Sequence, residues 1–236
     1  MMVCTIISHS LDPFLPFAES YYGRYMKTRV IIGDEHDSYE QFLSWHRLTA
    51  EDAMSDGIQR SGLGLVVDAD DILVPCPRRY RDLAHYIREF LARESLYSTA
   101  VAYEVFDLSA APDPYTQELD VSINFEEPLL KQRRRWLRSE SYDKTLLSKV
   151  ALRYGDLHDL QSHQKCTDGD LYMIHLGRID YGICKLRHAI FAKDKKLRDE
   201  HHWNLDGGKY RHWFYQMDTD ILQRLEAIPE HMMAAL

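Results

Sequence analysis

The sequence predicts an α/β fold built on a mixed, mostly parallel central sheet that is flanked by helices. Within the first seventy residues, three short apolar segments alternate with two helical segments. Such alternation is typical of parallel strands joined by right-handed crossovers. The 236 residues, 45% of them hydrophobic, are enough for one domain with a substantial core. We therefore expect a main domain at residues 1–190 and a helical appendage at residues 191–236 that packs on it.

Five expected elements fill the first part of this domain. The expected strands cover residues 3–7, 29–33 and 63–67, and the expected helices cover residues 13–26 and 38–60. Asp12 before Pro13 is a favoured helix start, because the carboxylate caps free amides and proline is tolerated in the first turn. Ser38 and Gln41 form a capping box for the second helix. This order places the strand ends at residues 34 and 68 on one edge of the sheet.

The second half carries fewer regular signals. Apolar residues at helical spacing after Pro77 predict a helix, and the alternating segment 98–108 predicts a strand. Residues 109–128 contain three of the eight prolines and no helical period, so we expect a long loop there. A further strand is expected at residues 171–174, and a final helix at about residues 218–228.

Three carboxylates follow the expected strand at residues 63–67. Asp68, Asp70 and Asp71 stand where that strand should end. Ligands of open α/β sheets bind at the carboxyl ends of the strands, and like charges this close need a cation or hydrogen-bond donors to offset their repulsion. Mg²⁺ or Mn²⁺ suits them, because such ions bind carboxylates together with substrate phosphate oxygens. An acidic turn that caps the next helix is the alternative.

The composition argues against several classes of function. A net charge of −8 is not typical of a general nucleic-acid-binding protein, which carries a basic surplus. Four scattered cysteines without a C-x-x-C pair argue against a disulfide scaffold or a structural zinc site. The absence of G-x-G-x-x-G and Walker A patterns disfavours dinucleotide-binding and P-loop enzymes. With no signal peptide and no apolar run of membrane-spanning length, we expect a soluble cytoplasmic protein.

Residues 57–75, GIQRSGLGLVVDADDILVP, resemble the Asp-x-Asp segment of family-two glycosyltransferases, which have the GT-A fold. In that family a helix ends in a small residue, an apolar strand follows, and the acidic run closes with an apolar pair and a proline. The resemblance implies a GT-A-like single domain, with a nucleotide-binding half at residues 1–108 and an acceptor-side half at residues 109–190.

Residues 142–188 are similar, more loosely, to the later half of bacterial members of the same family. The matching positions are Lys149, Gly155, His158, His175, Gly177, Arg178 and Lys185. Together the two segments cover about half of the chain. The order of the matched residues implies that the expected strand at residues 171–174 delivers His175 to the same edge of the sheet as the acidic run.

Residues 131–136, KQRRRW, match the Gln-x-x-Arg-Trp pattern of processive, membrane-embedded polysaccharide synthases. Those enzymes also carry transmembrane helices and an upstream Glu-Asp pair, and this sequence shows neither. We therefore interpret the segment as a solvated basic helix turn. Arg135 is kept as a candidate for contact with a diphosphate, because a guanidinium group suits phosphate oxygens.

The resemblance assigns roles to particular residues. Asp70 is expected to bind the metal ion, with His175 as a further ligand. The residues expected to contact the nucleotide sugar are Asp34, Asp68, Ala69, Arg135 and Arg178. Asp156 and Asp159 are the candidate general bases, and His158 between them is the alternative metal ligand.

These roles predict a metal-dependent glycosyltransferase that uses Mn²⁺ or Mg²⁺. It is expected to move a sugar from a nucleotide-diphosphate donor, with a UDP-sugar favoured, to a glycan of the cell surface, an exopolysaccharide or a small molecule. Inversion at the anomeric carbon is implied by the resemblance alone, and no nucleic-acid partner is expected. Three alternatives stay open: a non-catalytic nucleotide- or sugar-binding module, a nucleotidyltransferase, and a glycosyltransferase that acts on modified DNA bases.

Overall fold

The computed structural model describes residues 2–34, 36, 39–106, 123–133, 135–155, 160–161, 164–191 and 224–236. The strands in these ranges are β1 (Val3–Ser8), β2 (Lys27–Ile32), β3 (Gly64–Asp68), β4 (Asp71–Pro75), β5 (Tyr97–Val105), β6 (Arg135–Arg138), β7 (Lys144–Ser148), β8 (Thr167–His175) and β9 (Glu226–Ala227). The α-helices are α1 (Leu15–Gly23), α2 (Tyr39–Ser61), α3 (Leu83–Ala92), α4 (Leu129–Gln132) and α5 (Tyr181–Phe191).

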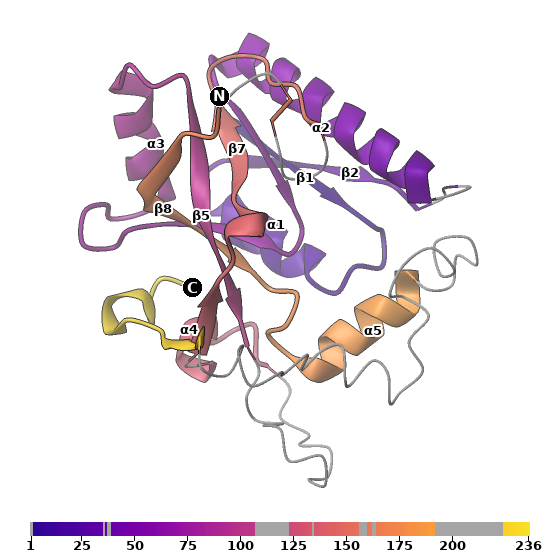
Figure 1. Ribbon diagram of the computed structural model, residues 1–236, viewed down its shortest axis with the longest axis vertical. Coiled ribbons are helices and arrows are strands. Elements are labelled where there is room, and N and C mark those ends of the chain that lie inside the picture. The colour runs from indigo at the N-terminus through magenta and orange to yellow at the C-terminus, as the bar shows by residue number, and fades with distance from the viewer. Residues whose placement is uncertain are drawn as a thin grey trace, which may run out of the picture.

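All of these strands belong to one mixed sheet (Figure 1). Its main path runs β2-β1-β3-β7-β5-β6-β9, and β8 pairs with β5 and carries β4 on its outer side. The first three strands are parallel, with β1 between β2 and β3. The expected α/β class and the expected strand-helix-strand-helix-strand order at the N-terminus are confirmed.

The expectation of a mostly parallel sheet is wrong. Only the β1–β2, β1–β3 and β5–β8 pairs are parallel within the described residues, whereas five pairs are antiparallel. β6 pairs with Tyr103–Val105 of β5 and β7 pairs with Tyr97–Ala100, both antiparallel. The short 3-10 turn at Glu140–Tyr142 joins β6 to β7 without reversing the chain, so the two strands follow one another along β5.

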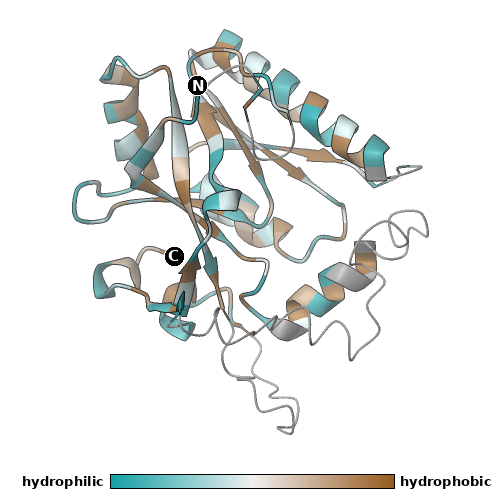
Figure 2. Ribbon diagram, viewed as in Figure 1, coloured by the Kyte–Doolittle hydropathy of each residue, from teal (hydrophilic) through white to brown (hydrophobic). Residues whose placement is uncertain are grey.

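β1 and β3 consist mostly of buried residues, whereas β2 begins with Lys27, Thr28 and Arg29 and has no buried residue. Figure 2 shows hydrophobic residues, in brown, along the strands of the sheet. Ile6 and Val67 pack with α1 and α3 in the larger core, whereas Ile7 and Val66 pack against α2 on the opposite face. Alternate residues of a strand point to opposite faces, so the continuous apolar run of β3 is buried on both sides. Asp68, the last residue of β3, is the first residue of the strand that is only partly buried.

The end of α2 determines how β3 approaches that point. Gly62 has φ +75°, a left-handed conformation that favours glycine, and its amide donates to Ile58 O at 2.8 Å. Gly64 then lies so close to α2 that an added Cβ would meet Met54 Sδ at 2.3 Å. The pair of glycines therefore lets the chain reverse directly from the helix into the strand.

Two expected helices differ in the structure. α3 begins at Leu83 and not near Pro77, because Asp82 caps it by accepting from His85 N at 2.7 Å. The expected helix at about residues 218–228 falls partly outside the described residues, and Glu226–Ala227 form a strand paired with β6. Among the described helices, none is both long and apolar enough to cross a membrane.

Candidate functional site

The acidic run forms a tight turn between β3 and β4. Asp68 ends β3, Ala69 and Asp70 make the turn, and Asp71 begins β4. Leu176 N donates to Asp70 O at 2.8 Å, which ties the turn to the end of β8. Asp70 is 3% exposed and Asp71 is fully buried. β4, and not a helix, follows the turn, so the alternative of an acidic turn that caps the next helix is wrong.

Lys144 bridges two carboxylates of this turn. Its Nζ, at the start of β7, donates to Asp68 Oδ2 and to Asp71 Oδ2, each at 2.7 Å. Burial by itself would raise the pKa of Asp68 and of Asp71, but the Lys144 ammonium, helped by His46 at Asp68 and His175 at Asp71, holds both pKa values below the ordinary one. Burial would likewise lower the pKa of Lys144, and the two carboxylates raise it instead. The three groups form a buried ionic cluster.

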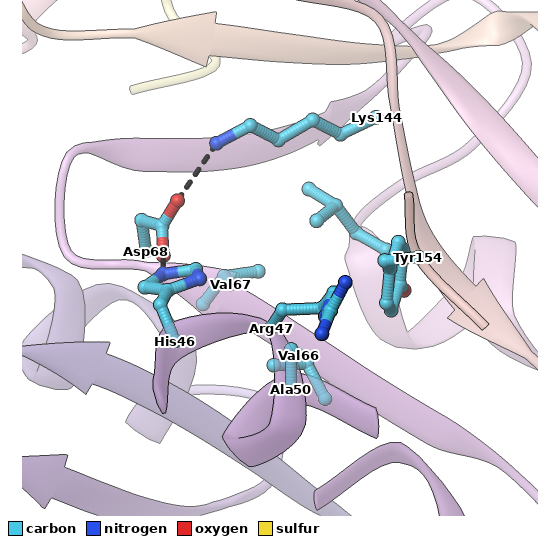
Figure 3. Close-up of a pocket in the computed structure, with 9 residues that line it drawn as sticks. His46, Arg47, Ala50, Val66, Val67, Asp68, Lys144 and Tyr154 are labelled. Atoms are coloured by element: carbon cyan, nitrogen blue, oxygen red, sulfur yellow. Dashed lines mark hydrogen bonds and ion pairs between the residues drawn. The ribbon is translucent and has the colours of Figure 1, made fainter. Parts of the chain in front are cut away.

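His46 occupies the other oxygen of Asp68. Its Nε2 lies 2.5 Å from Asp68 Oδ1, and the ring stands on the inner face of α2. A small cavity of about 20 Å³, enough for about one water molecule, lies between α2 and the sheet. Figure 3 shows His46 and Lys144 directed toward Asp68, while Arg47 extends toward Tyr154 across the cavity. Both oxygens of Asp68 are thus held by protein groups.

Arg187 of α5 pairs with Asp70. Its Nη1 donates to Asp70 Oδ2 at 2.6 Å, and its Nε donates to Asp12 Oδ2 at 2.9 Å. Asp12, in the loop after β1, also accepts from Phe14 N at 3.0 Å. Burial raises the pKa of Asp12 above its ordinary value despite the Arg187 guanidinium. α5 is therefore tied to the acidic turn and to the start of α1.

His175 ends β8 beside Asp70 and Asp71, as the sequence predicts. Its Nδ1 lies 3.0 Å from Asp71 Oδ1 and 3.7 Å from Asp70 Oδ2. Burial would lower the pKa of His175, but Asp70 and the hydrogen bond to Asp71 raise it. The Tyr142 ring stacks on the imidazole, with ring centroids 4.8 Å apart. An added Cβ on Gly177 would meet His175 Nε2 at 2.6 Å, so glycine leaves room for this ring.

These three side chains fit a divalent cation by geometry. One ligand atom from each of Asp70, Asp71 and His175 lies within 4.8 Å of the others. Two ligands at right angles on an ion with bonds of about 2.1 Å would lie about 3 Å apart, which is close to the separations from His175 Nδ1. Asp70 Oδ1 makes no hydrogen bond to any described residue, so Asp70 keeps one oxygen for a cation while Arg187 holds the other.

The charges of the site also favour a divalent cation. Four carboxylates, those of Asp12, Asp68, Asp70 and Asp71, face two permanent cations, Lys144 and Arg187. The remaining partners are histidines, which carry a charge only when protonated. A divalent ion would balance the excess of negative charge. An imidazole beside carboxylates is a ligand set that suits Mn²⁺ better than Mg²⁺, which is bound mainly through oxygen.

The other expected nucleotide-sugar contacts are more dispersed. Asp34 follows β2 and is tied to the loop after β1, where Ser10 N donates to its Oδ1 at 2.7 Å. Ala69 is 1% exposed, and its methyl group belongs to the core. Arg178 lies 3.7 Å from Glu104 Oε1 and over the Phe106 ring. Arg135 lies in β6, opposite Ala227 of β9, so it is part of a strand and not of a helix turn.

Several residues that were expected at the site are either outside the described residues or have another role. Asp156, His158 and Asp159 lie outside the described residues. Lys149, one of the positions matched to the glycosyltransferase pattern, donates to Leu91 O and Arg93 O, and thus holds the end of α3. The lysine that reaches the acidic turn is Lys144, five residues earlier in the same segment.

Sequence reasoning missed four residues at this site: His46, Glu104, Lys144 and Arg187. His46 stands four residues before Ala50 on the buried face of α2, and that spacing is a usable signal. Lys144 begins an apolar strand segment, an unusual place for a lysine. Glu104 is 6% exposed in β5, opposite His175 in the β5–β8 register. Arg187 gives no comparable signal, because its partners are distant in sequence.

Comparisons of the chain with models of protein families, with curated proteins and with solved structures found no match.

Proposed function

We propose that this protein is a glycosyltransferase that takes a sugar from a nucleotide-diphosphate donor and uses a divalent metal ion, Mn²⁺ or Mg²⁺. The observation that carries the proposal is the meeting of Asp70, Asp71 and His175 at the point where β3 ends, with ligand atoms within 4.8 Å of one another. The resemblance of residues 57–75 to the Asp-x-Asp segment of family-two glycosyltransferases supports it. A UDP-sugar is the favoured donor, and a glycan or small molecule is the acceptor.

Each part of the site has a task in this proposal. Asp70 and His175 hold the ion, which acts as a Lewis acid toward the leaving diphosphate. Lys144 keeps Asp71 ionised and fixed. The Arg187 guanidinium stands beside Asp70 and suits a diphosphate oxygen, because its planar donors match phosphate geometry.

Transfer also needs a base. The acceptor hydroxyl loses its proton to a carboxylate, its oxygen attacks the anomeric carbon, and the bond to the diphosphate breaks, so the diphosphate leaves with the electron pair. Asp156 and Asp159 are the candidates from sequence. Glu104 joins them, because it is nearly buried, pairs with His175 in the β5–β8 register and contributes to the raised pKa of that histidine.

The test is a thermal-shift screen of UDP, GDP, CDP and dTDP, each with and without Mn²⁺. A nucleotide at about a hundred times its dissociation constant should stabilise the protein by about 2.7 kcal/mol. We expect one nucleotide to stabilise only with metal, and Asp70→Asn to remove the effect. Asp52→Asn, the same change on the exposed face of α2, is the matched control and should keep it. Equal stabilisation without metal, or none from any nucleotide, would contradict the proposal.

A non-catalytic nucleotide- or sugar-binding module is the second candidate. It is favoured by one observation: Asp68, Asp70 and Asp71 each already pair with a basic side chain of the protein. Release of the nucleoside diphosphate from a UDP-sugar separates the two candidates. A module would show metal-dependent stabilisation by the nucleotide and no release above that of the Asp70→Asn variant.

A further inference from the structure

β2 lies at one end of the sheet and has an open outer edge (Figure 1). Among the described residues, β1 is the only strand that pairs with it. Gly33 N, directly after β2, donates to Ser8 O of β1 at 3.0 Å. Successive residues of a strand direct their backbone groups to opposite edges, so the odd-numbered residues of β2 bond to β1 and the even-numbered residues point outwards. The residues whose amide and carbonyl groups face the open edge are Thr28, Val30 and Ile32.

The side chains of these three residues form a row on the face of β2 that is turned away from α2. Ile32 is 42% exposed, and Thr28 and Val30 are half-buried. β-branched side chains pack well against one another across neighbouring strands. The open edge therefore combines unpaired backbone groups with side chains that suit a second strand.

The other face of the edge has room for the side chains of an added strand. A groove of about 310 Å³ opens between β2 and α2, bounded by Arg29 and Ile31 on one side and by Ala53 and Asp56 on the other. Arg29 Nη1 donates to Asp56 Oδ2 at 2.9 Å, so its charge is offset within its own chain. An added strand thus meets a paired arginine and not an isolated cation.

The backbone of β2 is complementary to a second copy of itself. In an antiparallel pair with Val30 opposite Val30 of the second copy, Thr28 stands opposite Ile32 of that copy. All of these residues direct their backbone groups outwards, so each opposed pair can exchange both of its hydrogen bonds. The same register brings β-branched side chains together on the face turned away from α2.

The charges of β2 select this register. It places Arg29 opposite Ile31 and Lys27 opposite Gly33, so that no two like charges stand directly opposite each other. A register centred on Arg29 would oppose two guanidinium groups. A register centred on Ile31 would pair only the last part of the strand.

We propose that two copies of this chain pair antiparallel through β2, about a two-fold axis at Val30, and form one continuous sheet. A two-fold interface uses the same surface of both copies and must be self-complementary, which the register at Val30 provides. The proposal involves neither the metal ion nor the nucleotide, so it stands or falls independently of the proposed function.

The test is a pair of double variants whose new charges meet only across this interface. Thr28 and Ile32 are about 13 Å apart within one extended strand, but each stands opposite the other in the dimer. Thr28→Lys with Ile32→Lys sets like charges opposite each other, whereas Thr28→Glu with Ile32→Lys sets opposite charges there. Neither residue is buried, so both variants should fold. Leu91→Lys, on α3 with a residue exposure of 44%, is the matched control.

Sedimentation velocity at a series of protein concentrations measures the dimer, and circular dichroism checks the fold. We expect the wild-type protein and Leu91→Lys to dimerise equally. The variant with two lysines should dimerise about ten-fold more weakly, because two equivalent pairs become repulsive, and the variant with glutamate and lysine should recover.

Two results would overturn the proposal. A wild-type protein that is monomeric at every concentration would leave the edge to a strand of another protein or to solvent. A dimer that both double variants affect equally would be formed through another surface.

Discussion

Replacing Lys144 with methionine should destabilise the protein more than any other single change at this site. The side chain of Lys144 is 5% exposed and donates two hydrogen bonds of 2.7 Å to Asp68 and Asp71. Methionine has a similar volume but no charge, so the variant leaves two buried carboxylates without their shared cation. Removing one partner of a buried ion pair costs about 3–5 kcal/mol. The expected loss in the free energy of unfolding is of that size, measured by urea denaturation at pH 7.

The pH dependence of the variant separates this cause from a packing defect. In the wild-type protein the pKa values of Asp68 and Asp71 are lowered, so their stabilisation is present above the unfolded pKa of about 4 and is lost as the pH falls. Without Lys144, burial should raise both pKa values above those of the unfolded chain. The variant should then become more stable as the pH falls from 8 to 5, whereas the wild-type protein should not.

A double variant provides the internal control. Asp71→Asn in the Lys144→Met background removes one of the two unpaired charges, so it should be more stable than Lys144→Met alone. A Lys144→Met protein with the wild-type free energy of unfolding, or one whose deficit is unchanged between pH 8 and pH 5, would refute the assignment of Lys144 as the counter-charge of the turn.

Three further predictions concern the frame around the site. Asp82→Ala removes the cap of α3, whose carboxylate accepts from His85 N, and should cost about 1 kcal/mol in urea denaturation. Gly62→Ala places a side chain at φ +75° and should cost about 1–2 kcal/mol by the same measurement. Burial would raise the pKa of Asp168, but bonds from Asp170 N, Tyr86 and Arg93 lower it. Its stabilisation is thus lost as the pH falls, and Asp168→Asn should lose less stability than the wild-type protein between pH 5 and pH 3.

The sequence was sufficient for those features that depend on neighbouring residues. The apolar run of β3 and the acidic turn after Val67 are both local, and each is found where its pattern predicts it. The expected helix start at Asp12 is wrong, because α1 begins at Leu15 with Phe14 as its N-cap, and Asp12 accepts from Phe14 N in the turn before the helix. His175 at the end of β8 was also predicted, because an apolar strand and its last residue are visible in the chain itself. The parallel sense of the first three strands followed from the helices between them.

The sequence did not predict the direction of the later strands. An apolar strand has the same period in a parallel and in an antiparallel pair, so the pattern of β5 or β7 contains no information about direction. The pairing partner decides it: β6 and β7 both run antiparallel to β5, a neighbour that only the folded sheet reveals.

The sequence by itself determined that three carboxylates would gather at the end of a buried strand, because hydrophobic burial of Leu65 to Val67 leaves Asp68 at the edge of the core. Only the tertiary structure decided what would neutralise them. Lys144 and Arg187 come from β7 and α5, far along the chain, and a Coulomb interaction depends on distance in space and not on separation in sequence. Those partners offset part of the negative charge of the buried turn and hold Asp70 and His175 beside each other.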